Sequence, residues 1–518
     1  MLKPQASGIV PSPYRGLPIA SRTAMGVSGS CCIAGRARPL IPLSSRSSRP
    51  WAMASRAPSP RTTMSSTSCS ARREQSGCVR ESGSMRAYGV LDWLLNVRID
   101  KSTFLAPADV LAALLFVYLL ARRPHRGWVI TAVTAVALGV AIGWLVTWLV
   151  SDVWDVFGLP LTTVVRAWVV MTFAGVFLAV VNLIRTRWWR KLLAVLSIIV
   201  FLTAAAAAIN IDFGAYRNLK DAFGITPYPP LASRYLNGQV GPVDPTLAQT
   251  WHPPAGMPSK GKLGTVDIPA TTSGFNARAA SVYLPPAALV SSAPKLPVMV
   301  MFSGQPGTPA DLFTSGHLQG ILDAYAATHH GLAPIVVAPD QLGNPLSNPM
   351  CVDSSLGQSA SYLTVDVPHW ITSHLNVAGG PQQWAVGGYS QGGTCALQFG
   401  AGHPDLYRSI IDISGEIAPT IGRDTAKKAF GGSAAAYNAV KPLTLLARHA
   451  PYQDTLAIFG VGKQDAKYEP IIHAAQRAAT AAGMTTDLIQ SPKSSHDWNT
   501  VRYVLSRAVP EVATRMGL

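Results

Sequence analysis

A glycine-flanked serine stands between an apolar run and a run of small residues. Residues 384–397 read Trp-Ala-Val-Gly-Gly-Tyr-Ser-Gln-Gly-Gly-Thr-Cys-Ala-Leu and contain G-x-S-x-G from Gly388 to Gly392. Between a strand and a helix, this pattern places a serine on a sharp, strained turn, where larger flanking residues would collide with the strand or helix. We therefore predict that Ser390 is a nucleophile. An ordinary glycine-rich loop is the alternative.

A serine hydroxyl is a weak nucleophile and needs a histidine that removes its proton. When the nucleophilic serine lies on a turn between a strand and a helix, the acid follows it in the chain and the histidine follows the acid. His496 comes after the last β-like run and before the final helix-like run, so we predict that it is the base. Three other histidines follow Ser390 in the chain. His403 lies just after the expected serine helix, His449 lies in a polar run without a preceding strand, and His473 lies in the middle of an expected helix.

A carboxylate must hold the imidazole in one tautomer. Asp465 follows the apolar run 454–459, at the carboxyl end of the expected penultimate strand, from which it can reach His496. We predict that Asp465 is the acid. The alternatives are Asp412, Glu416, Asp424 and Asp497.

Two backbone N–H groups are expected to bind the oxyanion that forms during acyl transfer. The residue directly after the serine supplies one of them, here Gln391. The loop after the apolar run 296–302 reads Ser-Gly-Gln-Pro-Gly. Because Pro306 has no N–H, we predict Gln305 as the second donor. A simple Gly-Pro turn is the alternative for this loop.

The elements that position these residues alternate between β-like and helix-like runs from residue 258 to the end. Such alternation is typical of a parallel sheet covered by helices. The β-like runs are 282–284, 296–301, 335–338, 383–387, 409–413 and 454–459. We predict that residues 258–518 form an α/β domain, with a mostly parallel sheet and helices on both faces.

The low content of charged residues indicates that part of the chain does not lie in water. Only 13% of the 518 residues are charged, whereas soluble domains carry about 25%. Four apolar stretches, 104–121, 128–150, 161–184 and 192–209, are each about long enough to cross a bilayer. Because they have almost no polar face, we predict an α-helical transmembrane region of four helices over residues 86–210, rather than four buried soluble helices.

Loop charges predict how these helices are oriented. The first and third connections are basic, and the second holds Asp152 and Asp155 without a basic residue. Basic loops stay in the cytoplasm. We therefore predict a multi-pass plasma-membrane protein in which a proline-rich connector, residues 211–257, and the catalytic domain lie outside the membrane.

Most of the net charge of +17 lies in the first 85 residues, which carry twelve basic and two acidic side chains. This segment has no apolar periodicity, so we predict that it is disordered. It is either a basic interaction tail or a product of translation upstream of the natural start; the second is favoured, because a native tail would have to be exported. The charge therefore does not indicate a nucleic-acid partner.

Cysteines and metal-ligand patterns are sparse in the α/β domain. Cys351 and Cys395 are its only cysteines. In an oxidising compartment they could form a disulfide, and two unpaired thiols are the alternative. No cluster has zinc spacing and no glycine-rich phosphate loop occurs, so we predict no cofactor and no metal.

Several motifs together resemble the esterase D-like family of α/β-hydrolases, which also contains the mycolyltransferases. The resemblance covers residues 260–518 and rests on four segments: 282–286 (Val-Tyr-Leu-Pro-Pro), 384–397, 403–407 (His-Pro-Asp-Leu-Tyr) leading to 413–415 (Ile-Ser-Gly), and 495–498 (Ser-His-Asp-Trp). The resemblance implies that residues 258–518 form an α/β-hydrolase esterase domain, with Ser390 as nucleophile, Asp465 as acid and His496 as base. One departure is Ser-Gly at 303–304, where the family often has His-Gly. The four-helix segment looks like the anchor of membrane-bound members.

Taken together, these expectations predict a membrane-anchored serine carboxylesterase that acts on a lipid or cell-envelope ester. One alternative is an acyltransferase of mycolyltransferase type, which passes the acyl group to a sugar or lipid alcohol. A second alternative is an inactive hydrolase-fold binding module on a membrane sensor.

Overall fold

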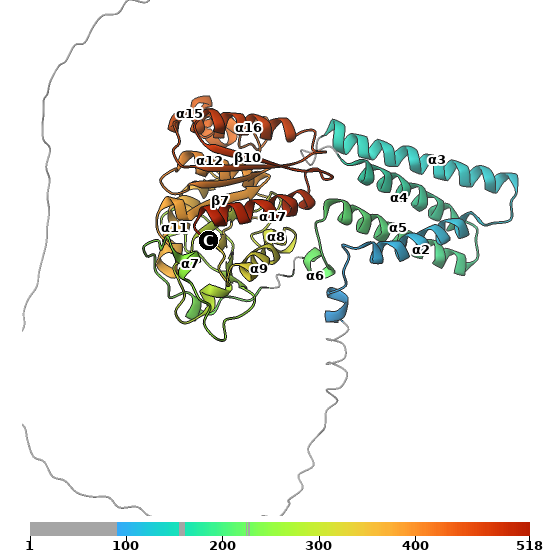
Figure 1. Cartoon of the computed structure of the whole chain (residues 1–518). Coiled ribbons are helices and arrows are strands. Elements are labelled where there is room, and N and C mark those ends of the chain that lie inside the picture. Colours follow the sequence, from blue (N-terminus) through green and yellow to red (C-terminus); the bar gives the residue numbers. More distant parts are fainter. Residues whose placement is uncertain (1–90, 155–160, 224, 226–227) are drawn as a thin grey trace, which may run out of the picture. The chain divides into compact units, whose positions relative to one another are not determined.

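The structure is a computed structural model, and it describes residues 91–154, 161–223, 225 and 228–518 (Figure 1). The expected disordered tail, residues 1–85, lies outside the described residues.

Four long apolar helices come first in the described part of the chain (Figure 1). They are α2 (Ser102–Leu120), α3 (Arg126–Trp148), which continues through the π-helix η1 (Leu149–Val153), α4 (Thr163–Asn182) and α5 (Trp188–Phe213). Each of the four is long and apolar enough to cross a membrane. The four apolar helices expected from the sequence are therefore present.

A buried polar cluster joins the ends of three of these helices. Asn182, fully buried, donates from Nδ2 to the carbonyl oxygens of Leu178 at 2.8 Å and Leu119 at 3.3 Å. Arg190 donates from Nε to Asn182 Oδ1 at 3.0 Å, and from Nη2 to the carbonyl oxygens of Tyr118 and Leu119 at 3.0 Å each. Because the last carbonyls of a helix have no partner inside it, this cluster fastens the end of α2 to α4 and α5.

The rest of the chain is built around an eight-stranded sheet with strand order β1-β2-β4-β3-β7-β8-β9-β10. The pairs from β4 through β10 are parallel, and β1–β2 and β2–β4 are antiparallel. The strands are β1 (Lys262–Val266), β2 (Ala280–Leu284), β3 (Val298–Phe302), β4 (Ile335–Ala338), β7 (Trp384–Tyr389), β8 (Ser409–Ile413), β9 (Leu456–Gly462) and β10 (Thr485–Ser491). Two short strands, β5 (Asp353–Ser354) and β6 (Gly357–Gln358), form a separate hairpin.

The central strands are apolar along their whole length because both faces of the sheet are covered. Every residue of β3, β7, β8 and β9 is buried. The edge strand β10 instead alternates between more and less exposed residues over Thr-Thr-Asp-Leu-Ile-Gln-Ser. The expected β-like runs include neither β10 nor β1, because neither forms a continuous apolar run.

Helices cover both faces of the sheet (Figure 1). On one face, α15 (Pro442–His449) contacts both α12 (Gln391–Gly402) and α16 (Glu469–Ala481); on the other, α9 (Leu318–Thr328) contacts α17 (Trp498–Arg515). Shorter α-helices among the described residues include α6 (Leu219–Ala222), α7 (Leu247–Thr250), α8 (Asp311–Thr314), α11 (Val367–His374), α13 (Thr425–Phe430) and α14 (Ala434–Ala439). The expected α/β-hydrolase architecture is confirmed.

Candidate active site

Ser390 occupies a sharp turn between β7 and α12. Its backbone lies at φ 57° and ψ −120°, which a residue with a side chain rarely adopts. Two hydrogen bonds hold the turn: Ser390 N donates to the carbonyl oxygen of Ile413 at 2.8 Å, and Thr394 N donates to that of Ser390 at 3.0 Å. Strain of this kind persists only where the surrounding fold imposes it, and it is concentrated at active sites.

The two outer glycines of G-x-S-x-G are required by close packing. A Cβ atom at Gly388 would lie 2.2 Å from the carbonyl oxygen of Gly392. A Cβ atom at Gly392 would lie 2.3 Å from the carbonyl oxygen of Ser303, at the end of β3. The start of α12 therefore lies directly against the loop that follows β3.

The serine, histidine and aspartate selected from the sequence lie within hydrogen-bond distance of one another. His496 Nε2 is 2.9 Å from Ser390 Oγ, and His496 Nδ1 is 3.2 Å from Asp465 Oδ2. Asp465 and His496 are only 2% and 8% exposed. A carboxylate beside Nδ1 favours the tautomer that carries its proton there, which leaves Nε2 free to accept from the serine hydroxyl.

Two tyrosine rings hold the imidazole of His496 in place. The ring centroids of Tyr389 and Tyr468 lie 5.0 and 4.2 Å from that of His496. Tyr468 N also donates to Asp465 Oδ1 at 3.1 Å. Sequence reasoning did not select either tyrosine, although Tyr389 directly precedes the serine; nothing in the local sequence marks Tyr468.

The alternative acids have other partners. Asp412 lies in β8, and its Oδ1 accepts from Gly415 N at 2.9 Å. Asp497 caps α17 by accepting from Thr500 N at 3.0 Å. Burial raises the pKa of Asp412 to about 7, and burial also raises that of Glu416 to about 7 against the opposing charge of Lys467. Asp424 directly precedes α13.

The alternative histidines are placed elsewhere. His473 lies within α16 and contacts Gln490, and His449 ends α15. His403 directly follows α12, at the end of that helix opposite Ser390.

The two expected oxyanion donors are on adjoining segments. Among the residues that the structure describes, no acceptor is hydrogen-bonded to the backbone N–H group of Gln391 or of Gln305. The Gln305 side chain donates to the carbonyl oxygen of Leu346 at 3.1 Å, and Gly307 N donates to that of Pro345 at 3.2 Å. The loop after β3 is thereby fastened to the loop after β4.

A cavity of about 480 Å³ lies beside this loop, within the size range of ligand pockets. Its walls include Gly307, two residues after Gln305, and Trp498, two residues after His496. Ala215 and Tyr216, which follow α5 closely, form another wall. Charged groups also line it: Asp221, Arg278 and Asp311.

The charged groups of the cavity are held by neighbours. Arg278 pairs with Asp340, with 2.7 Å between Nη2 and Oδ1. Burial raises the pKa of Asp311, and hydrogen bonds from the backbone and hydroxyl of Thr308, at 2.7 and 2.8 Å, oppose that rise.

The end of α5 is hydrogen-bonded to the helix that follows His496. Asn499 Nδ2 donates to the carbonyl oxygen of Asp212 at 3.0 Å, and Arg502 Nη1 donates to that of Gly214 at 2.9 Å. Asp212 and Phe213 lie with His496 around a small cleft. The segment that carries His496 and the last apolar helix are therefore neighbours.

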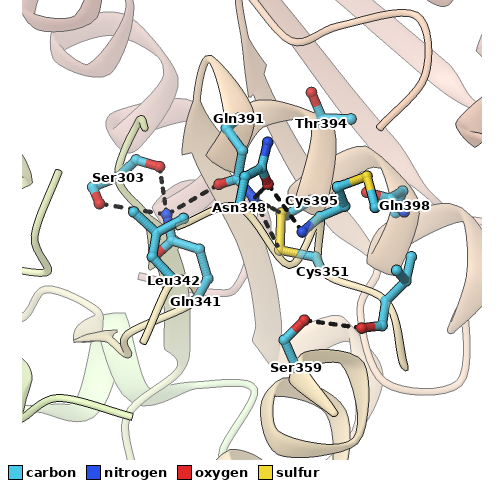
Figure 2. Close-up of a disulfide and its surroundings, with 12 residues drawn as sticks. Ser303, Gln341, Leu342, Asn348, Cys351, Ser359, Gln391, Thr394, Cys395 and Gln398 are labelled. Carbon is cyan, nitrogen blue, oxygen red and sulfur yellow. Dashed lines mark hydrogen bonds between the residues drawn. A yellow bond between two sulfur atoms is a disulfide. The ribbon is translucent and has the colours of Figure 1, made fainter. Parts of the chain in front are cut away.

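A disulfide joins Cys351 to Cys395, with 5.6 Å between their Cα atoms (Figure 2). This confirms one of the two alternatives left open by the sequence. The bond ties the loop after β4 to α12, four residues after Gln391. The described residues contain no group of three or more His, Cys, Asp or Glu side chains that could hold a metal ion.

Residues 276–503 match the family model described as "Putative esterase". A relative, an uncharacterized protein of Corynebacterium glutamicum, is 33% identical over 379 residues, which cover 71% of this chain and 86% of the relative.

Similar solved structures include a ferulic acid esterase, 19% identical with a TM-score of 0.42, covering 51% of this chain and all of that one. An S-formylglutathione hydrolase from Agrobacterium tumefaciens is 20% identical with a TM-score of 0.42, covering 50% of this chain and 97% of that one. On the family match, the corynebacterial relative and the sheet described above, this chain belongs to the esterase family of α/β-hydrolases.

Proposed function

We propose that this protein is a membrane-anchored serine esterase that hydrolyses a carboxylic ester through Ser390, His496 and Asp465. One observation carries the proposal. The strained Ser390 lies 2.9 Å from His496 Nε2, and Asp465 contacts the other ring nitrogen at 3.2 Å. A nucleophile, its base and the group that orients the base are thus in contact.

The reaction follows from this arrangement. His496 Nε2 takes the hydroxyl proton while Ser390 Oγ bonds to the ester carbonyl carbon. The amides of Gln391 and Gln305 bind the resulting oxyanion. When the C–O bond to the leaving alcohol breaks, His496 returns the proton to that alcohol. A water molecule then attacks the acyl-enzyme with His496 again as base, which releases the carboxylic acid and restores Ser390.

The cavity beside Gly307 and Trp498 is proposed to hold the substrate, and its position indicates the substrate class. Ala215 and Tyr216 line it and come directly after the last apolar helix. If α5 crosses a membrane, the cavity lies at the depth of the lipid headgroups. A lipid or cell-envelope ester, whose ester group lies at that depth, is therefore the proposed substrate.

We place this domain outside the plasma membrane. The basic first and third helix connections favour a cytoplasmic position for those loops. The disulfide between Cys351 and Cys395 is an independent argument, because disulfides persist in oxidising compartments. Protease added to intact cells is expected to degrade the catalytic domain, and protection of that domain would contradict this orientation.

The decisive experiment uses the full chain in lipid nanodiscs. A fluorophosphonate probe is expected to label the wild type and not Ser390→Ala, and the wild type is expected to hydrolyse ester substrates. No labelling at all would favour the binding-module alternative, whereas labelling that does not depend on Ser390 would mean that another group is the nucleophile. Product analysis with an added acceptor sugar separates hydrolysis from acyl transfer, since transfer yields an acylated sugar.

A further inference from the structure

A buried glutamine bridges the two segments that carry the proposed oxyanion donors. Gln341 follows β4 closely and is fully buried. Its Nε2 donates to the carbonyl oxygen of Ser303 at 2.7 Å and to the side-chain Oε1 of Gln391 at 3.2 Å (Figure 2). One amide group therefore contacts the end of β3 and the start of α12 together.

The chain of amides continues on the other side of Gln391. Gln391 Nε2 donates to Asn348 Oδ1 at 3.2 Å, and Asn348 Nδ2 donates to the carbonyl oxygen of Thr420 at 3.0 Å. Carbonyl oxygens only accept hydrogen bonds, so Ser303 fixes the orientation of Gln341 at one end and Thr420 fixes that of Asn348 at the other. Gln391, between them, has a single orientation that satisfies both neighbours.

The disulfide supports the same side chain. Gln391 Nε2 lies 3.3 Å from the Sγ of Cys395 and 3.7 Å from that of Cys351 (Figure 2). The Gln391 side chain is thus held by Gln341 on one side and by Asn348 and the disulfide on the other. It is 5% exposed.

We propose that Gln341 is a positioning residue for the oxyanion hole, a role that rests on the proposed function above. The carbonyl of Ser303 belongs to the peptide group that leads through Gly304 to the Gln305 amide. The other donor is the backbone amide of Gln391. Donors must lie within about 2.7–3.1 Å of the oxyanion, so the spacing of these two segments decides whether both can bind it. Gln341 fixes that spacing.

The buried, unpaired oxygen of Gln341 supports this positioning role, because it carries a cost in stability. Its Oε1 is buried and has no hydrogen-bond partner among the described residues. A buried acceptor without a partner destabilises a fold by about 1–3 kcal/mol. An apolar side chain of the same size would avoid that cost, but it would lose both N–H contacts.

The chain offers a matched control in Gln398, which lies in α12. Its Nε2 donates to the carbonyl oxygen of Val440 at 3.1 Å, and its Oε1 also has no partner among the described residues. Gln398 is 3% exposed. It resembles Gln341 in burial and in its unpaired oxygen, but it contacts neither Ser303 nor Gln391 among the described hydrogen bonds.

The test compares Gln341→Met with Gln398→Met in the full chain, using an ester that the wild type hydrolyses. Gln341→Met is expected to lower kcat by about 10- to 100-fold, as small displacements of catalytic groups do, with KM changed less than about threefold. A boronic acid inhibitor forms a tetrahedral adduct on serine, with an oxygen in the oxyanion hole. Its binding is expected to weaken by a factor similar to the loss of kcat. Gln398→Met is expected to leave both quantities within about threefold.

A second variant, Gln341→Glu, keeps the size of the side chain but cannot donate when ionised, so it is expected to show the same losses. Equal effects of the Gln341 and Gln398 variants would overturn the proposal, as would a loss of kcat without weaker boronic acid binding. Failure of both Gln341 variants to fold, when Gln398→Met folds, would also overturn it. Absence of Ser390-dependent hydrolysis in the wild type is a different result, which rejects the proposed function itself.

Discussion

Two buried polar clusters in this molecule differ in how completely they are bonded. In the helical segment, Arg190 donates to Asn182, and both side chains donate to carbonyl oxygens at the end of α2. In the α/β domain, Ser390 has a strained backbone, and the amides of Gln391 and Gln305 have no acceptor in the described hydrogen bonds. A cavity of about 480 Å³ lies beside the second cluster.

This difference in hydrogen bonding suits the Arg190 cluster to a structural role and the Ser390 cluster to the proposed chemical role. A polar cluster whose donors and acceptors are paired stabilises the fold and has no capacity left for a ligand. Strain and unpaired donors raise the free energy of the folded state, and they persist where the remaining structure imposes them. We propose that the free N–H donors of Gln391 and Gln305 bind the oxyanion of the transition state.

The largest effect is expected from removing the proposed nucleophile. Ser390→Ala should lower kcat by about 10⁵- to 10⁶-fold, because no oxygen remains to form the acyl-enzyme. His496→Ala should fall in the same range, since the two groups act as a unit. The measurement is ester hydrolysis by the full chain under substrate saturation. Residual activity above one per cent in Ser390→Ala would mean that another group is the nucleophile.

A smaller loss is expected when only the orienting carboxylate is changed. Asp465→Asn should lower kcat by about 10⁴-fold, because an amide at this position permits the wrong tautomer of His496. Asp497→Asn is the matched control, since its carboxylate caps α17 instead of contacting the imidazole. A larger loss of kcat in the control than in Asp465→Asn would show that the acid has been assigned to the wrong residue.

The three proposed site residues could be predicted mainly from their order along the chain. Loops at the carboxyl ends of parallel strands meet at one edge of a sheet, so a serine after β7 and an aspartate after β9 are brought close together. The position of His496 just before the final helix placed it at the same edge. Ser390, Asp465 and His496 were selected on these grounds, and they lie within hydrogen-bond distance.

Features that depend on side-chain packing between loops were not predictable in this way. Gln341 and Asn348 lie in a loop without periodicity, and their contact with Gln391 follows from the packing of β4 beside β3. The pairing of Cys351 with Cys395 was one of two open alternatives, because sequence spacing does not give the distance between the residues. The edge strand β10 was missed because it is half exposed and lacks an apolar run.

A buried carboxyl that takes no part in the proposed reaction is expected to affect stability through pH. The pKa of Asp412 is about 7 in the folded chain against an ordinary 3.8. Between these values the unfolded chain has released the proton and the folded chain keeps it, so stability falls as pH rises, by at most about 1.4 kcal/mol per pH unit. Asp412→Asn cannot ionise and should flatten this fall.

Thermal unfolding of the full chain from pH 4 to pH 8 measures this effect. The variant and the wild type should be similar near pH 4, and the variant should be the more stable near pH 8. Glu416, whose pKa is also raised to about 7, should supply the slope that remains. Parallel curves for Asp412→Asn and the wild type would show that Asp412 does not keep its proton in the folded chain.

The smallest effect on catalysis is expected from the saturated cluster of the helical segment. Arg190→Met removes the donors to the carbonyl oxygens of Tyr118 and Leu119 and should destabilise the chain by about 1–3 kcal/mol. Since no atom of this cluster faces the cavity, kcat should stay within about twofold. Arg123→Met, at an exposed position of a neighbouring loop, is the control and should change neither quantity. A loss of kcat in Arg190→Met without a loss of stability would erase the distinction between the two clusters, because a fully bonded group would then act on the chemistry.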